Sequence, residues 1–179
     1  MKATELLTQQ HRRVTAALEK ILAANGGRAA LMEVAGDLAA HMAIEQELFY
    51  PAVHAMDPDL VMASYEEHAI AEIELKRALS VGQDGSFIVK VQVLKELLEH
   101  HIAEEEQELF PVVRDLLPAG ALEELGARMQ QAFDEIRSSG FASVVPDGFA
   151  HTSSDDDKHA LFGRHDGRAS RPAQQGIAK

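Results

Sequence analysis

Two eleven-residue stretches of the chain place imidazoles and carboxylates at the same spacing. Residues 41–51 read HMAIEQELFYP, and residues 101–111 read HIAEEEQELFP. Each begins with His, carries Glu four positions later and ends with Pro at the tenth step. On a helix, residues four apart lie on the same face, one turn from each other. Imidazole nitrogen and carboxylate oxygen are both metal ligands, so the repeat predicts two related halves of a metal site.

Helical periodicity extends over the first 140 residues. We predict four long helices: from Ala3 to about Asn25, from about Ala29 to Met56, from an Asp57-Pro58 cap to just before Gly82, and from Ser86 to about Leu117. A shorter fifth helix is expected at about 121–138. Because the connections are short, neighbouring helices are expected to be antiparallel. The predicted fold is all-α: an up-and-down four-helix bundle with a short fifth helix and a flexible C-terminal tail.

The composition changes after residue 140. Residues 1–140 hold 12 Lys/Arg against 24 Asp/Glu, whereas residues 141–179 hold five of each and are rich in Gly, Ser, Asp and Pro. Such a segment buries too little apolar surface to fold by itself. We therefore predict one domain over 1–140 and a disordered tail over 141–179.

Composition also excludes several classes of function. The chain has no Cys, which removes disulfides, iron–sulfur clusters and thiol nucleophiles. A net charge of -12 disfavours binding to nucleic acid or anionic lipid. No apolar run reaches the roughly 18 residues of a membrane span, and the N-terminus lacks a signal-peptide pattern. We expect a cytoplasmic protein whose partner is a small molecule or a cation, with oligomeric state open and a monomer plausible.

Each predicted long helix carries one His at mid-length on its apolar stripe. In the first helix, for example, His11 lies between Leu7 and Val14. A single His on such a stripe is more often a core residue than a ligand, and a single HxxxE pair is often a surface contact. Four converging imidazoles with carboxylates are different, because unpaired polar groups in a core are costly. The predicted metal ligands are His11, His41, Glu45, His68, His101 and Glu105.

The register of the fourth helix leaves alternatives, since His100–Glu104 and His101–Glu106 are also possible pairs. Alignment on Pro111 and the apolar stripe both select His101 and Glu105, which places His100 on the helix flank. Continued at steps of three and four, the stripes predict further inward positions at Leu48, Ala52, Leu109 and Val112. His54 and the tail histidines His151, His159 and His165 are expected at the surface.

A donor set of imidazole and carboxylate without sulfur suits iron, manganese or zinc. Six donors exceed the three or four protein ligands of an ordinary zinc site. Two His for each metal, with two carboxylates able to bridge, favour a pair of irons with open positions for oxygen, peroxide or nitric oxide. The Glu-x-x-His pairs of ferritin-like bundles are absent from residues 1–140.

These residues resemble the hemerythrin-like family and its HHE cation-binding domain. The resemblance covers about residues 3–117 and rests on the histidines and HxxxE stretches described above. It implies an antiparallel four-helix bundle with an oxo- or hydroxo-bridged diiron centre, in which Glu45 and Glu105 are bridging carboxylates.

The chain departs from the oxygen-carrying hemerythrins at two positions. Those proteins have a second His one turn after the third-helix His, where this chain has Glu72, and HxxxxD where it repeats HxxxE. A more anionic site would favour ferric iron, which argues against reversible oxygen carriage. Glu72 is a candidate third carboxylate ligand, an outer partner orienting a His, or a proton relay. Tyr65, one turn before His68, either hydrogen-bonds a bound oxygen species or packs.

The leading hypothesis is a diiron protein that turns over or detoxifies peroxide, nitric oxide or a related small oxidant. If it is an enzyme, it is a diiron oxidoreductase of the catalase or peroxidase kind. The alternative is a binding protein, either an iron or oxygen sensor or an iron store, whose folding responds to metal. A purely structural helical protein is the third reading.

Overall fold

The computed structural model describes residues 1–24, 26–82 and 85–139, so the predicted tail lies outside the described residues. The regular structure of the described part is entirely helical, with no strand, which confirms the predicted fold class. None of its helices is both long enough and apolar enough to cross a membrane. The elements are α1 (Ala3–Ala23), α2 (Arg28–Ile44), η1 (Glu45–Phe49), α3 (Tyr50–Val53), α4 (Pro58–Ser80), α5 (Gly85–Glu104), η2 (Glu105–Leu109), α6 (Phe110–Leu116) and α7 (Ala119–Ser139).

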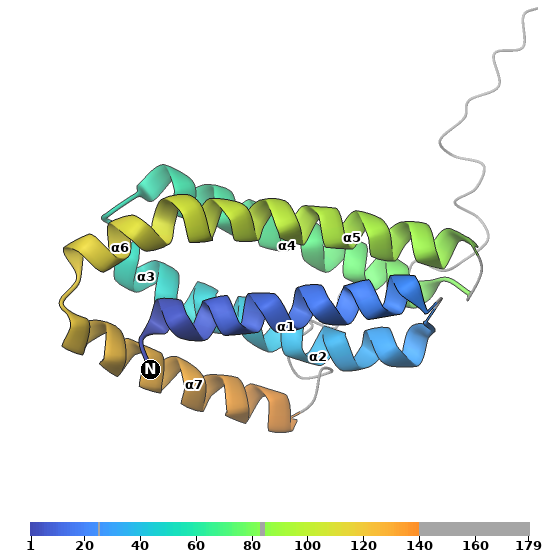
Figure 1. Ribbon diagram of the computed structural model, residues 1–179, viewed down its shortest axis with the longest axis horizontal. Helices are drawn as coiled ribbons and strands as arrows, with labels where there is room; N and C mark the ends of the chain where they lie inside the picture. Colours follow the sequence, from blue (N-terminus) through green and yellow to red (C-terminus); the bar gives the residue numbers. More distant parts are fainter. Residues whose placement is uncertain (25, 83–84, 140–179) are drawn as a thin grey trace, which may run out of the picture. The chain divides into compact units, whose positions relative to one another are not determined.

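Four helical arms form a closed ring in the described part of the chain (Figure 1). α1 packs against α2 and α5, and α4 packs against the same two helices. The second arm runs continuously through α2, η1 and α3, and the fourth through α5, η2 and α6. The start of α4 follows the predicted cap, because Oδ1 of Asp57 accepts a hydrogen bond from the Leu60 amide at 3.1 Å and Pro58 opens the helix.

The fifth helix, α7, has 21 residues, as many as α1. It lies along α1 and α2 (Figure 1). The N-terminus of the chain crosses α7 at Gly126. A Cβ at this position would lie 2.8 Å from the Ala3 nitrogen and 2.9 Å from the Lys2 carbonyl carbon. The absence of a side chain at Gly126 therefore allows α7 to approach the start of α1.

Each HxxxE stretch contains a turn of π-helix immediately before its proline. The Tyr50 amide donates to the Glu45 carbonyl, and the Phe110 amide donates to the Glu105 carbonyl, each five residues back. Proline lacks an amide hydrogen, and its ring clashes with the carbonyl four residues earlier in a regular α-helix. The wider π turn makes room for the proline ring, and it explains why the repeat extends as far as Pro51 and Pro111.

The π turns add one residue to each arm and shift the inward face. The predicted inward position Ala52 is wrong: it is exposed, and Val53 is buried in its place. Leu48 and Val112 are only half-buried, whereas Phe49 and Val113 are fully buried. Regular steps of three and four could not anticipate this shift.

Two apolar cores lie on either side of a polar layer. One contains Leu7, Ile44, Val61 and Leu109 among others, and the second contains Val14, Leu38, Ala71 and Leu98 among others. Along each arm the sequence position between the two sets is occupied by one of the four predicted ligand histidines. The bundle therefore places all four imidazoles at one level, with apolar packing on both sides.

Candidate metal centre

The structure brings the six predicted ligands together at this level. His11, His41, His68 and His101 are each no more than 5% exposed, and Glu45 and Glu105 are fully buried. His100 instead has a side chain 67% exposed, and His54 is exposed. The inward register of α5 is thus the one that aligns His101 and Glu105 with His41 and Glu45.

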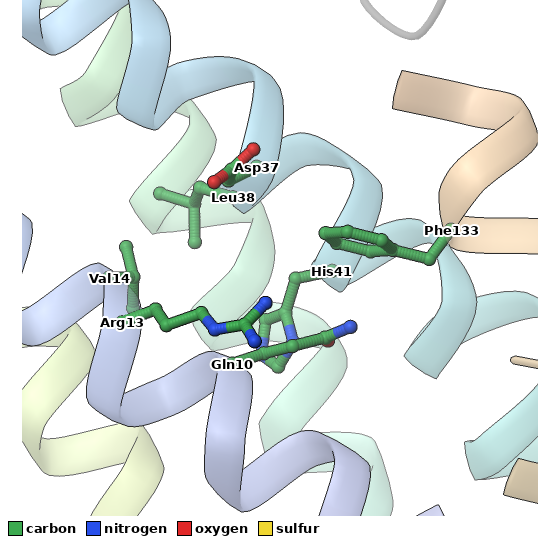
Figure 2. A pocket seen from close by; sticks show the side chains of 7 residues that line it. All are labelled: Gln10, Arg13, Val14, Asp37, Leu38, His41 and Phe133. Atoms are coloured by element: carbon green, nitrogen blue, oxygen red, sulfur yellow. The ribbon is translucent and has the colours of Figure 1, made fainter. Parts of the chain in front are cut away.

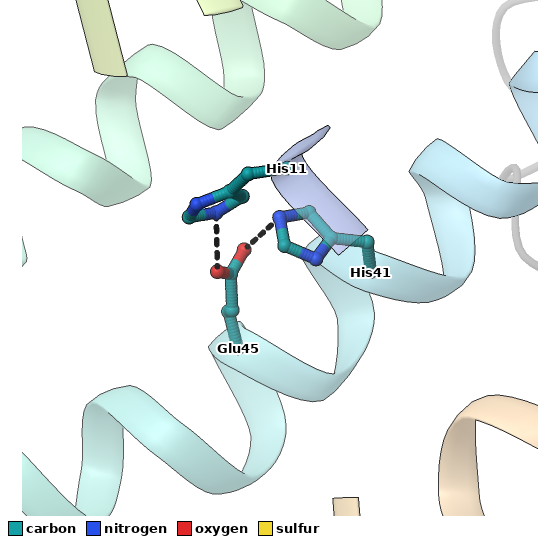
Figure 3. A group of neighbouring side chains, drawn as sticks. All are labelled: His11, His41 and Glu45. Carbon is teal, nitrogen blue, oxygen red and sulfur yellow. Dashed lines mark ion pairs between the residues drawn. The ribbon is translucent and has the colours of Figure 1, made fainter. Parts of the chain in front are cut away.

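Glu45 joins the imidazoles of α1 and α2. Its Oε1 lies 3.7 Å from Nε2 of His11, and its Oε2 lies 3.2 Å from Nε2 of His41 (Figure 3). Both imidazoles direct the same ring nitrogen at the carboxylate. The three side chains form a compact group of metal-ligand atoms.

The same carboxylate also reaches the other half of the bundle. Oε2 of Glu45 lies 3.3 Å from Nε2 of His68, and Glu45 forms a second ligand group with His68 and His101. Glu105 spans the two halves as well, since its Oε2 lies 3.3 Å from Nε2 of His11 and 3.7 Å from Nε2 of His101. Both carboxylates thus stand between the two pairs of imidazoles.

Several of these inward atoms are buried without a hydrogen-bond partner: Nε2 of His11, both carboxylate oxygens of Glu45 and Oε2 of Glu105. A buried polar atom left unsatisfied costs about 1–3 kcal/mol, more when charged. These four atoms lie around one small volume, where Nε2 of His11 faces the Glu45 and Glu105 carboxylates at 3.7 and 3.3 Å, and a metal ion would give them a common partner. Neutral imidazole nitrogen and carboxylate oxygen suit iron, manganese or zinc, so the donor set fits a metal ion.

All four imidazoles are held from outside through their other ring nitrogen. Nδ1 of His41 bonds Oε1 of Gln10 at 2.8 Å, Nδ1 of His11 bonds Glu106 at 2.9 Å, Nδ1 of His101 bonds Glu67 at 2.9 Å, and Nδ1 of His68 bonds the Gln46 amide at 3.1 Å. At His11, His41 and His101 the Nδ1 hydrogen is donated to an oxygen, which leaves Nε2 free to bind a metal. At His68 the amide nitrogen of Gln46 donates to Nδ1, so this contact places the ring hydrogen of neutral His68 on Nε2.

The outer partners repeat with the same approximate two-fold symmetry as the ligands. Gln10 and Glu67 each precede the His of their helix, and Gln46 and Glu106 each follow the inward Glu. Each partner orients an imidazole on a different helix from its own. The sequence analysis did not predict these roles, but the matched positions in the repeat were a usable signal.

Tyr50 breaks this symmetry and was also missed. Its fully buried phenol donates a hydrogen bond to Oε1 of Glu105 at 2.9 Å and lies 3.2 Å from Nε2 of His68. The corresponding residue of the second stretch is Phe110, which stacks on His11 with ring centroids 5.9 Å apart. The phenol oxygen is therefore an additional oxygen donor on one side of the centre.

The structure does not bring Glu72 to the centre. The Glu72 side chain is 39% exposed, and its carboxylate lies 3.3 Å from the Lys76 ammonium. Tyr65 contacts residues that surround the centre and not the centre itself. Its hydroxyl donates to the Gln46 carbonyl at 3.0 Å, and its ring packs edge-on against Tyr50 with ring centroids 5.1 Å apart. Tyr65 supports Gln46 and Tyr50 without reaching the inward ligand atoms.

Burial and neighbouring charges shift the pKa values of the imidazoles in opposite directions. Burial lowers the pKa of His41 to about 3, which the charge of Glu45 offsets only in part. Burial also acts to lower the pKa of His11, but the nearby carboxylates of Glu105, Glu106 and Glu45 outweigh it and raise that pKa well above its ordinary value. The pKa of His101 is raised for the same kind of reason, against burial, by Glu105 and Glu67.

The acidic groups respond in the complementary direction. Burial acts to raise the pKa of Glu45, but the ring nitrogens of His11 and His68 that face its carboxylate hold that pKa well below its ordinary value. Burial together with Glu45 and Glu105 raises the pKa of Tyr50. These directions favour an ionised Glu45, a protonated Tyr50 phenol and imidazolium at His11 and His101 near pH 6.5, and a metal ion that binds these side chains would replace the imidazolium protons.

Two spaces approach the centre from outside. A small cavity of ≈ 20 Å³ lies beside Gln10 and the outer side of His41, covered by Phe133 of α7 (Figure 2). A larger hollow of ≈ 270 Å³ on the surface of α1 and α5 is lined by His11 and Glu106. The side chain of Glu106 is 32% exposed, so solvent reaches the residue that holds Nδ1 of His11.

An antiparallel four-helix bundle with a buried layer of four imidazoles and two spanning carboxylates defines a class of metalloprotein. The comparisons agree with this class. The family model described as hemerythrin HHE cation binding domain matches residues 2–113. The chain belongs to this family, and the domain binds metal.

A solved structure with the same architecture is the hemerythrin HHE cation-binding domain-containing protein from Mycobacterium kansasii. The two chains are 26% identical, with a TM-score of 0.68, and the match covers 78% of this chain and 89% of that chain. A comparison with curated protein sequences finds no match.

Proposed function

We propose that this protein holds two iron ions in the polar layer and acts on small oxidants, either peroxide or nitric oxide, as a diiron oxidoreductase of the cytoplasm. The observation that supports this proposal is the set of buried atoms without hydrogen bonds on His11, Glu45 and Glu105. His11 and His41 would hold one ion, His68 and His101 the other, and Glu45 and Glu105 both. Bound iron would supply the electron transfer and the Lewis acidity.

The protein's own residues would prepare the site for this chemistry. Glu106 and Glu67 accept from Nδ1 of His11 and His101, which makes these imidazoles more electron-donating towards a ferric ion. Tyr50 would complete the ligand sphere on the side of His68. The apolar cores above and below keep bulk water away from the ligand atoms.

The size of the approach supports a small substrate. The hollow is lined by His11 and Glu106, and the inward carboxylates and imidazoles behind it are almost fully buried. Peroxide, oxygen and nitric oxide pass through such packing by small side-chain movements. Glu106 contacts both His11 and solvent, so its carboxylate lies where a proton could pass between them.

The proposal is tested by turnover on iron-loaded protein. Oxygen evolution from peroxide and consumption of nitric oxide are measured for the wild type and for Glu105→Gln, which keeps the side-chain shape but weakens metal binding. Turnover in the wild type and its loss in the variant are expected. Iron-loaded wild type that consumes neither oxidant would contradict the activity and favour the sensor or storage role.

A further inference from the structure

We propose that Glu67, His100 and Glu104 form a second divalent-cation site, exposed on the α4–α5 surface beside the buried centre. The inference rests on the proposed function only for its link to that centre. The three side chains come from facing positions: Glu67 from α4, and His100 and Glu104 from one turn of α5. They share no ligand atom with the buried groups.

The distances suit a single ion. Nε2 of His100 lies 3.5 Å from Oε1 of Glu67 and 3.4 Å from Oε1 of Glu104, and one ligand atom from each residue lies within 4.8 Å of the others. Ligands on opposite sides of an ion bound at about 2.1 Å are about 4.2 Å apart. An ion could therefore be accommodated by small rotations of exposed side chains.

The local charge favours a cation with open positions. The group joins two acidic side chains to one imidazole, a donor set of carboxylate oxygen and imidazole nitrogen that suits a divalent cation. The His100 side chain is 67% exposed, and those of Glu67 and Glu104 are 22% and 28% exposed. Water can complete the coordination, as expected for an exchangeable site for Zn²⁺ or Fe²⁺.

Glu67 connects this surface site to the buried centre. Its Oε1 faces His100, while its Oε2 accepts from Nδ1 of His101 at 2.9 Å. A cation bound to Glu67 weakens the hydrogen bond between Glu67 and His101. In turn, a change in the protonation or metal binding of His101 alters the negative charge that Glu67 offers to the cation. By linkage the two sites must influence each other's affinity equally.

The role that follows is capture of ferrous iron at the surface, one side chain away from the buried ligands. The equivalent position on the opposite side of the bundle is built differently. There the outer partner of His41 is the neutral amide of Gln10, which offers no charge for a cation. The surface site thus belongs to one half of the bundle only.

The test is titration of the iron-loaded full-length chain with Zn²⁺ by calorimetry. All variants are made in a background where His151, His159 and His165 are replaced by Ala, which removes binding by these histidines. We expect one saturable site that His100→Ala weakens at least tenfold and Glu104→Gln also weakens. His54→Ala and Glu124→Gln, which change an exposed His and an exposed Glu elsewhere, serve as matched controls and should leave the affinity unchanged.

Iron content is recorded on the same samples before and after titration, which separates the two proposals. Absence of iron from the wild type would count against the buried centre. The surface site would still be supported if binding of one equivalent of Zn²⁺ were weakened by His100→Ala. Binding that His100→Ala leaves unchanged, or no saturable binding, would overturn the surface site. A slower uptake of Fe²⁺ by the His100→Ala apoprotein, with the same final iron content, is the expected kinetic result.

Discussion

The phenol oxygen of Tyr50 lies 2.9 Å from Oε1 of Glu105, although 55 positions separate the two residues along the chain. The π turn before Pro51 brings the Tyr50 ring into the polar layer, where it also approaches the inward nitrogen of His68. This contact gives the centre one oxygen donor that its approximate symmetry does not predict.

Replacing Tyr50 with Phe tests this donor. Iron-loaded wild type is expected to show a visible phenolate-to-iron band, because metal charge can displace the phenol proton despite the raised pKa of Tyr50. The Y50F variant should lose the band and about 1 kcal/mol of unfolding free energy through the lost hydrogen bond. Tyr65→Phe is the control and should retain the band. Identical spectra for wild type and Y50F would contradict coordination by Tyr50.

Removal of metal should destabilise the fold. In the metal-free chain the inward atoms of His11, Glu45 and Glu105 are buried without hydrogen bonds. A metal that binds only the folded state stabilises it by about 4 kcal/mol at a thousandfold excess over its dissociation constant. We expect thermal scans to show a clear fall in the midpoint after chelation and its recovery on adding iron. Equal midpoints with and without iron would count against a buried site.

Metal binding should release protons at slightly acid pH. The raised pKa values of His11 and His101 keep both imidazoles protonated there, whereas His41, with a pKa of about 3, contributes no proton. The release should decline as pH rises through the raised values. The stabilisation of the metal-free fold by these two groups is present below pH 6.5 and is lost over the same interval.

The release is measured by calorimetry of metal binding in two buffers with different ionisation enthalpies. The observed heats should differ at pH 6.5 and converge at higher pH. Buffer-independent heat at pH 6.5 would show that these imidazoles are already neutral.

Two glycines of α7 should respond in opposite directions to the same substitution. A Cβ at Gly126 meets the backbone of Lys2 and Ala3, so Gly126→Ala should cost about 1–3 kcal/mol in unfolding free energy. At Gly120 a Cβ meets nothing within 4 Å. Gly120→Ala should therefore stabilise the chain by up to about 1 kcal/mol through helix propensity. Denaturant unfolding compares both variants, and equal effects would contradict the close approach at Gly126.

The convergence of the six side chains could be predicted from the sequence because it follows from periodicity, whereas their role as metal ligands stays a prediction. His11, His41, His68 and His101 each interrupt an apolar stripe at mid-length, and a bundle core concentrates whatever its stripes carry. The π turns could not be predicted in this way, because they change the period itself. As a result Ala52 was placed inward, and Tyr50, which lies just beyond the shift, was overlooked.

The outer partners were missed for another reason. Each acts on a helix other than its own, so its role depends on how neighbouring helices are rotated, which stripes alone do not specify. Glu72 shows the reverse case: it follows His68 by one turn, yet it contacts Lys76 instead of the centre. The predicted domain boundary at residue 140 and the predicted cytoplasmic location stay predictions.

The most direct test of the central claim is the iron content of the purified chain, with the near-ultraviolet and visible spectrum of the same sample. Wild type should hold about two irons per chain with oxo-to-iron charge-transfer bands, in keeping with two His per metal and shared carboxylates. Glu45→Gln should lose most of this iron, because both ligand groups include Glu45. A wild type without iron, or a Glu45→Gln variant that holds as much iron as the wild type, would contradict a shared centre in the polar layer.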